Sequence, residues 1–369
     1  MHRFQYGLLI PLLVILLLAG CSQATTQEVA EAEPTATAII STPEPTIEPT
    51  IAPTPEPTPT EEPIPVAVEP GLVAGFSPTT GRAWTEAYHP VCVMIENSAA
   101  ARPHSGLSQA DVVYECTVEG AITRFMAVFS DTMPEKVGPV RSCRIYYVDL
   151  QQEWDALLVH FGGPVKGTGT VSVYEKFERD GVKQRLDGIS GHASIARDSG
   201  RAAPHNAYVN LTKAQPAYNY EPEYVHAWFF DAAYPYQSAQ VAEVTIPYPA
   251  AGNTVRYVWD GERSAWARFL GTKPFMDREP NEQVYVTNVV VQRANQVGMG
   301  TREGHINIEL IGSGTATFYI RGMQIEGTWE KADGKSRTVF RDMTGEEIRF
   351  APGNTWIQFV PLDMQVAAE

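Results

Sequence analysis

The stretch Asp111–Phe129, with the sequence DVVYECTVEGAITRFMAVF, predicts a β-hairpin. Apolar residues occupy every second position of its first part, and a period of two is typical of a strand. Gly120 and Ala121 then allow a turn into the apolar run that follows Arg124.

The remaining positions of the first strand include three carboxylates, Asp111, Glu115 and Glu119. Residues four apart on a strand are separated by about 13 Å, so these side chains cannot chelate one metal ion together. We therefore favour a solvated sheet face, with Glu119 close to Arg124 across the turn.

Strand and helix signals alternate around this hairpin. The continuous apolar run Pro90–Ile95 predicts a buried strand, and Ala156–Phe161 predicts another. Helical periodicity extends from Ile145 to Asp155, and shorter helices are predicted at two further stretches, Thr170–Phe177 and Ala207–Ala214. These elements indicate a mixed α/β domain over residues 84–225.

From about Val241 the chain changes to short segments rich in valine, tyrosine and threonine, separated by turns such as Asp260-Gly261 and Asp333-Gly334. Closely spaced short strands of this kind predict a mainly β domain over residues 240–362, either a sandwich or a barrel. The predicted fold class is therefore α+β: a mixed α/β domain followed by an all-β sandwich or barrel-like domain.

The N-terminus has the features of a secretory signal. A basic start is followed by the apolar run Tyr6–Ala19, which is short for a membrane span. Leu18-Ala19-Gly20-Cys21 resembles the lipobox of bacterial lipoproteins, in which the cysteine thiol accepts a diacylglyceryl group. We predict a signal peptide over residues 1–21, lipidation of Cys21 and anchoring in the bilayer at the extracytoplasmic face; the alternative is an uncleaved anchor helix.

Residues 22–75 are rich in Pro, Thr and Glu and contain no aromatic residue and no Lys or Arg. Such a segment cannot bury enough apolar area to offset the entropy of ordering it, so we predict a disordered stalk. When the nine glutamates of this segment and Arg3 are left out of the count, the formal net charge changes from −15 for the full chain to −7 for the remainder. A modestly acidic body argues against a nucleic acid as partner.

Three cysteines remain after Cys21, namely Cys92, Cys116 and Cys143. An odd count in an exported protein permits at most one disulfide. None of the three has metal-ligand spacing, and small buried thiols are favoured, although a Cys92–Cys116 bridge stays open. We predict no metal site and no cofactor.

Several motifs are similar to those of one family. They are Val93–Asn97, Ala101–Leu107, Gly138–Ser142, Val159–Gly163, Pro204–Tyr208, Asn288–Gln292 and Pro352–Ile357. Together they resemble the YerB-type lipoproteins of Gram-positive bacteria, which consist of two consecutive domains of unknown function. The resemblance covers nearly everything after the stalk. It implies a fold and an extracytoplasmic location but no reaction.

Standard catalytic signatures are absent from the sequence, so no catalytic residue is assigned. The stretch Gly162–Thr170 lacks the Gly-Lys-Ser/Thr order of a phosphate-binding loop, and we interpret it as a mobile loop rather than a phosphate cradle.

Arginine and histidine residues form the candidate ligand site. Guanidinium groups and helix N-termini both favour phosphate or carboxylate, and we expect Arg141 and Arg144 to share one face at the start of a helix. The predicted ligand-binding residues are Glu96, Asn97, Glu119, Arg124, Arg141, Arg144, His160, His205 and Asn206. The alternative is that the arginines form internal ion pairs with Glu96, Glu115 or Glu119.

These features favour a membrane-anchored extracytoplasmic lipoprotein that binds an anionic small molecule, a cell-envelope polymer or an envelope protein. One alternative is an enzyme acting on a phosphorylated or glycan envelope substrate, in which the arginines clamp the anion and His160 or His205 acts as acid or base. A purely structural role is the third hypothesis.

Overall fold

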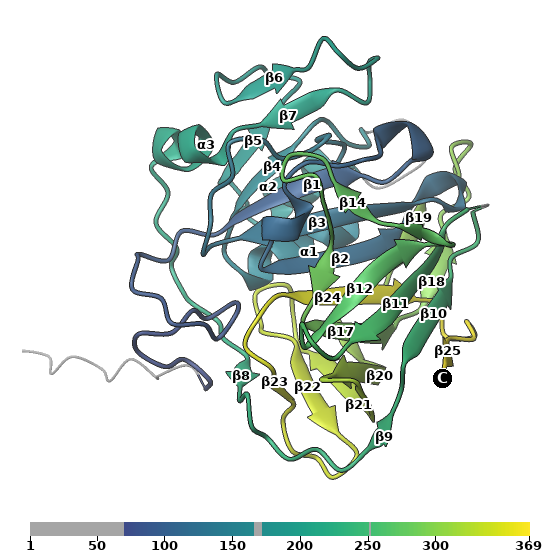
Figure 1. The fold of residues 1–369 in the computed structure, drawn as a ribbon. Helices are drawn as coiled ribbons and strands as arrows, with labels where there is room; N and C mark the ends of the chain where they lie inside the picture. Colours follow the sequence, from purple (N-terminus) through teal and green to yellow (C-terminus); the bar gives the residue numbers. More distant parts are fainter. Residues whose placement is uncertain (1–69, 166–171, 251) are drawn as a thin grey trace, which may run out of the picture. The chain divides into compact units, whose positions relative to one another are not determined.

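The predicted hairpin lies at the centre of a large mixed sheet (Figure 1). The computed structural model describes residues 70–165, 172–250 and 252–369. Strand β2 (Val112–Thr117) pairs antiparallel with β3 (Thr123–Phe129), as predicted. The signal peptide, Cys21, the stalk up to residue 69 and the glycine-rich loop beyond Val165 lie outside the described residues.

The first half of the chain builds one side of this sheet. Strand β3 pairs antiparallel with β1 (Val91–Glu96), and β1 pairs parallel with β4 (Leu157–His160), which in turn pairs parallel with β5 (Arg185–Asp187). The two predicted apolar strands are therefore confirmed.

The second half continues the same sheet. Strand β24 (Thr355–Val360) pairs parallel with β2 on one side and with β17 (Asn288–Arg293) on the other. The sheet then extends through antiparallel pairs to β20 (Gly312–Ile320), β21 (Met323–Lys331) and β22 (Val339–Asp342). Strands of both predicted domains thus hydrogen-bond in one sheet.

A second sheet covers one face of the large sheet, in front of β2 and β24 in Figure 1. Its strands are β10 (Glu243–Pro247), β11 (Thr254–Asp260), β12 (Ala265–Leu270), β13 (Lys273–Pro274), β16 (Tyr285–Val286) and β25 (Ala367–Ala368). Apolar residues of this sheet, such as Tyr257 and Trp266, share a core cluster with Val113, Phe125 and Trp356.

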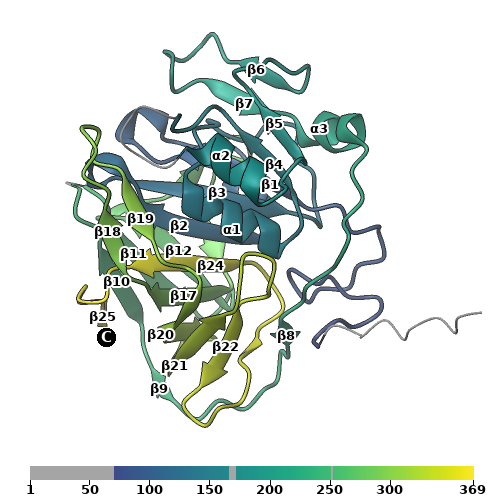
Figure 2. The ribbon, with the colours of Figure 1, turned by 180° about the vertical axis from the view of Figure 1, so that it is seen from behind.

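Two helices cover the opposite face, in front of the large sheet in Figure 2. Helix α1 (Ile145–Glu153) confirms the predicted periodicity, and α2 (Val173–Arg179) begins where the side chain of Ser172 accepts a hydrogen bond from the Glu175 amide. Buried residues of these helices share a second core cluster with Cys92, Tyr114 and other residues of the sheet. Within the described residues no helix is long and apolar enough to cross a membrane.

The remaining strands are short. They are β6 (Ile195–Arg197) with β7 (Ala207–Val209), β8 (Phe229–Phe230) with β23 (Arg349–Phe350), β9 (Ala239–Gln240) on β21, β14 (Met276–Asp277) with β15 (Glu282–Gln283), and β18 (Gln296–Gly298) with β19 (Ile306–Ile308). The fold class is as predicted, with a mixed first half and a β-rich second half.

The helix predicted over Ala207–Ala214 is wrong at its start. Ala207–Val209 is strand β7, and helix α3 (Leu211–Tyr218) begins only after Asn210. The Asn210 side chain accepts a hydrogen bond from the amide of Lys213, and a side chain that caps an amide in this way starts a helix.

The solvated acidic face is also wrong, because both faces of β2 are buried. Asp111 is 4% exposed and Glu115 is fully buried. Glu115 forms an ion pair with Arg268 of β12, with 2.8 Å between Oε2 and Nη2, and Asn97 and Thr123 donate hydrogen bonds to its Oε1. The guanidinium carbon of Arg268 lies 4.7 Å from the ring centres of Phe275 and Trp356.

This buried pair generates a stability prediction. Arg268→Met should lower the free energy of unfolding by about 3–5 kcal/mol, because it leaves the Glu115 carboxylate buried without a cation. The matched control is Arg256→Met, on the neighbouring strand, whose pair with Glu243 is partly exposed and should contribute about 0–1 kcal/mol. Urea unfolding of both variants measures these changes in the free energy of unfolding. Equal losses for Arg268→Met and Arg256→Met would contradict the prediction.

Candidate functional site

Most of the predicted ligand residues lie at one edge of the large sheet. Glu96 ends β1, His160 ends β4, and Arg124 stands opposite Glu96 in the β1–β3 register. The connection before α1 crosses this edge, since the Glu96 amide donates to the Pro139 carbonyl and the Phe161 amide donates to the Arg141 carbonyl. Residues from separate stretches of sequence therefore do meet at this edge.

One ion cluster joins Glu119 to two arginines. Nη2 of Arg124 lies 3.4 Å from Oε1 of Glu119, and Nε of Arg144 donates to Oε2 at 2.9 Å. Arg124 is buried and also donates to the Ser142 carbonyl at 2.8 Å. Burial by itself would raise the pKa of Glu119, but the charges of Arg124 and Arg144 outweigh it and lower that pKa to about 2.

A second cluster joins Glu96 to Arg141 and His205. Nδ1 of His205 lies 2.9 Å from Oε2 of Glu96, and Nε of Arg141 lies 3.6 Å from the same oxygen. The Ser98 hydroxyl donates to the other Glu96 oxygen at 2.8 Å. The Glu96 side chain is only 4% exposed, whereas those of Arg141 and His205 are 31% and 25% exposed.

Arg141 and Arg144 do not share a helical face, contrary to the prediction. Helix α1 begins at Ile145, Arg144 is its N-cap in an extended conformation, and Arg141 lies in the connection before it. The two arginines consequently pair with different acids.

The remaining predicted residues hold the local structure together. Asn97 donates to Glu115 and Thr123, and Asn206 accepts from Arg197 and donates to two backbone carbonyls. His160 is fully buried with Nδ1 3.0 Å from the Gly162 carbonyl oxygen, and burial lowers its pKa. The internal ion pairs of the alternative interpretation are present for all three arginines, while ligand binding at this edge stays a prediction.

The three described cysteines are free and buried, so the Cys92–Cys116 bridge is not formed. Burial raises the pKa of each thiol, to about 12 for Cys143. Small buried thiols, the favoured interpretation, agree with this arrangement.

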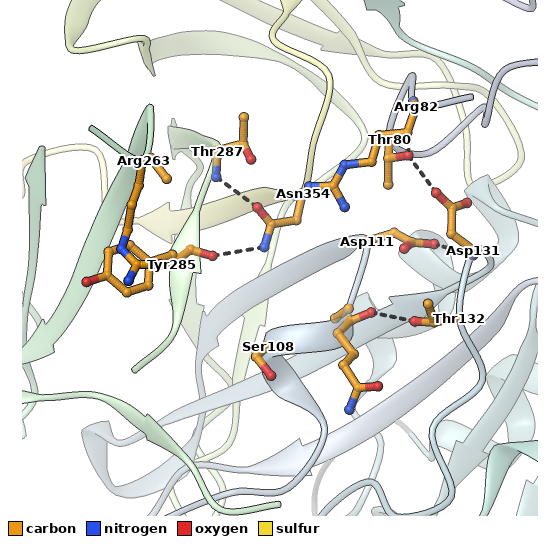
Figure 3. Close-up of a pocket in the computed structure, with 13 residues that line it drawn as sticks. Thr80, Arg82, Ser108, Asp111, Asp131, Thr132, Arg263, Tyr285, Thr287 and Asn354 are labelled. Atoms are coloured by element: carbon orange, nitrogen blue, oxygen red, sulfur yellow. Dashed lines mark hydrogen bonds between the residues drawn. The ribbon is translucent and has the colours of Figure 1, made fainter. Parts of the chain in front are cut away.

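The opposite edge of the sheet contains a cavity of about 510 Å³, which we call the seam cavity (Figure 3). It lies where the amino ends of β2 and β24 meet, since the Thr355 amide donates to the Asp111 carbonyl at 2.9 Å. Its lining residues come from both halves of the chain: Thr80, Arg82, Ser108, Gln109, Ala110, Asp111, Asp131, Thr132, Arg263, Ala265, Tyr285, Thr287 and Asn354.

Two aspartates and Thr80 line one wall of the seam cavity, and the neighbouring Ser77 and Thr79 donate hydrogen bonds to these aspartates. Oδ2 of Asp111 accepts hydrogen bonds from the amides of Ser130 and Asp131, at 2.7 and 3.0 Å, and from the Thr79 hydroxyl. Both oxygens of Asp131 accept from hydroxyls, those of Ser77, Thr79 and Thr80. Burial and the charge of Asp131 raise the pKa of Asp111 to about 7.

The facing wall carries an aromatic ring, an amide and one arginine, Arg263. The guanidinium of Arg263 lies over the Tyr285 ring, 4.5 Å from its centre, and 3.6 Å from Asp260. Asn354 is held on both sides, because its Oδ1 accepts from the Thr287 amide and its Nδ2 donates to the Tyr285 carbonyl (Figure 3). Arg82 forms no ion pair within the described part of the chain. Such a set of groups is suited to hydroxyls and to an anion.

The sequence did not predict this site, because its residues are spread from Thr80 to Asn354, and Asp111 was assigned to a solvated sheet face. One signal was present in the Pro352–Ile357 motif. Gly353 has φ 154°, and a Cβ atom at this position would collide with the Thr287 side chain. Glycine is needed there so that Asn354 can reach the cavity wall.

The Glu119 cluster generates a pH prediction. Since its pKa is lowered from 4.5 to about 2, Glu119 stabilises the fold above pH 4.5, and this contribution is lost as the pH falls through 2. At neutral pH, the free energy of unfolding of Glu119→Gln should be lower than that of the wild type by up to about 3 kcal/mol, and the difference should shrink at low pH. Exposed Glu303 provides the control, Glu303→Gln. Parallel stability–pH curves for wild type and Glu119→Gln would refute this.

Comparison with known proteins identifies the family. Residues 79–223 match the N-terminal domain of a protein of unknown function, DUF3048, and residues 244–357 match its C-terminal domain. The "Putative lipoprotein YerB" of Bacillus subtilis (strain 168) is 31% identical over 287 residues, which cover 76% of this chain and 83% of that protein. The crystal structure of YerB from Bacillus subtilis superimposes with a TM-score of 0.68, covering 79% of this chain and 99% of that one. The chain therefore belongs to the YerB-type family of lipoproteins with two DUF3048 domains.

Proposed function

We propose that this protein is a lipid-anchored extracytoplasmic lipoprotein whose folded part binds a ligand of the cell envelope in the seam cavity. The single observation that carries the binding role is the seam cavity itself. Arg82, which has no ion pair among the described residues, and the stacked pair of Arg263 and Tyr285 line it. Binding sites are typically concave and combine an aromatic surface with a few fixed polar groups.

The N-terminal sequence supports the location. The lipobox ending at Cys21 supplies the acyl anchor, and each buried methylene of an acyl chain contributes about 0.8 kcal/mol to membrane binding. A proline-rich stalk of this length can extend by roughly 3.1 Å per residue and would hold the folded part away from the bilayer. The name of the Bacillus subtilis relative agrees with this assignment.

The enzyme alternative has weaker support. Arg124 and Arg144 are paired with Glu119 and Arg141 with Glu96, and His160 is buried. Within the described part of the chain, the seam cavity and four other cavities are lined by other side chains. A partly exposed imidazole, His205 beside Glu96, is the observation that keeps an acid–base role as the second candidate.

The anchor is tested by fractionation. Cys21→Ala should abolish incorporation of a labelled fatty acid and move the chain out of the membrane fraction, because no thiol remains to accept the lipid. Ser22→Ala, next to the predicted cleavage site, should stay lipidated. If the Cys21→Ala chain stays membrane-bound, the uncleaved anchor helix is the better hypothesis.

The binding role is tested by co-sedimentation with isolated cell-wall sacculi. Tyr285→Ala should reduce binding by about tenfold, because aromatic side chains at the centre of a binding site commonly contribute more than 1 kcal/mol. Tyr234→Ala is the matched control, since Tyr234 also lies under an arginine, Arg349, but lines a different cavity.

Equal sedimentation of the Tyr285→Ala and Tyr234→Ala variants would exclude the seam cavity as the binding site for this material. Failure of the wild-type protein to sediment would argue against a wall polymer as the ligand.

A further inference from the structure

One carboxyl oxygen at the seam cavity accepts no hydrogen bond from the described residues. Asp111 is 4% exposed, and its Oδ2 accepts three hydrogen bonds, two from amides and one from Thr79. Its other oxygen, Oδ1, accepts none from the residues that the structure describes. Because Asp111 lines the cavity, a ligand group is a natural partner for Oδ1.

The surroundings of Asp111 favour its neutral acid. Burial and then the charge of Asp131 raise its pKa to about 7, against the hydrogen bonds that lower it. The other ionisable groups around it are Tyr88, whose pKa is raised by burial, and the two arginines that line the cavity, Arg82 and Arg263. Because Oδ2 is already occupied by three donors, the proton of the acid belongs on Oδ1, where it can be donated to a ligand.

The remaining walls indicate what kind of ligand would accept that proton. No acid of the described ranges pairs with Arg82, and guanidinium groups pair with carboxylate or phosphate. Tyr285, with Arg263 stacked on it, offers a flat surface, and Asn354, Ser108 and Thr132 offer groups for hydroxyls. Figure 3 shows these side chains arranged around one hollow, with Arg82 and Asp111 on neighbouring parts of its rim.

We propose that the ligand of the seam cavity is a sugar or polyol bearing a carboxylate or phosphate, which Arg82 binds while the acid form of Asp111 donates a hydrogen bond to it. This inference rests on the proposed binding role of the same cavity. Loss of the proton from Asp111 removes the donor and adds a negative charge beside the ligand anion, so binding weakens as the pH rises through neutrality.

The test uses the mature chain and three probes. These are a muramic-acid-containing disaccharide, which carries a carboxylate, a glycerol phosphate oligomer, and chitobiose as the neutral control. Affinities are measured by calorimetry between about pH 5.5 and about pH 8.5, a range that spans the titration of Asp111. The two acidic probes distinguish a sugar acid from a polyol phosphate.

The wild-type protein should bind at least one acidic probe roughly tenfold more weakly at the upper pH, through loss of the donor and charge repulsion. Asp111→Asn keeps an acceptor for the three donors and a donor at the free position, so its affinity should stay nearly constant with pH. Exposed Asp363 provides the control, and Asp363→Asn should retain the wild-type pH dependence.

A second variant keeps the test valid if Asp111→Asn does not fold. Arg82→Gln should weaken the acidic probe by about tenfold and leave chitobiose unchanged, whereas Arg302→Gln, at an exposed arginine, should change neither. This inference is overturned if the wild type binds an acidic probe equally well at every pH, or if Arg82→Gln leaves that binding unchanged. Either result would leave the proposed binding role intact. Absence of binding by any probe together with absence of binding to sacculi would overturn both.

Discussion

The ion pair between Glu115 and Arg268 is the constraint on which the arrangement of the two halves depends. Both side chains are fully buried, one on the central hairpin and the other on the covering sheet. A second buried pair, Glu153 with Lys331, joins helix α1 to strand β21 in the same way. In each pair the first half supplies the acid and the second half the cation. Separating the halves would leave charges buried without a partner, which is costly.

The same joining of the halves creates the seam cavity. Strands β2 and β24 run parallel, and their amino ends place Asp111 beside Thr355 and bring Asn354 to the cavity wall. The arginines and histidines predicted as a site lie at the opposite edge, where β1 and β4 end. One sheet therefore has two polar edges, and the two differ in their residues.

The two edges differ in how their charges are satisfied. At the Glu96 and Glu119 edge, every predicted arginine has an acid within the fold, so these cations stabilise loops and strand ends. At the seam cavity, no described residue supplies such an acid to Arg82 or a hydrogen bond to Oδ1 of Asp111. Charges already paired internally contribute to stability, whereas those left unpaired at a concave surface are available to a ligand.

Local patterns in the sequence determined the hairpin, the strand Val91–Glu96 and helix α1, because each depends on neighbouring residues alone. The lipobox at Cys21 is a prediction from a local pattern of the same kind. The α+β class followed from the same patterns. The solvated face assigned to Glu115 was wrong because a period of two shows which residues share a face but not what covers that face. Only the tertiary structure decided that a second sheet lies there with Arg268 opposite Glu115. The tertiary structure alone brought Arg82, Asp111 and Asn354 together. The parallel pairing of β2 with β24 joins residues more than 240 positions apart, and such a pairing has no local signature in the sequence.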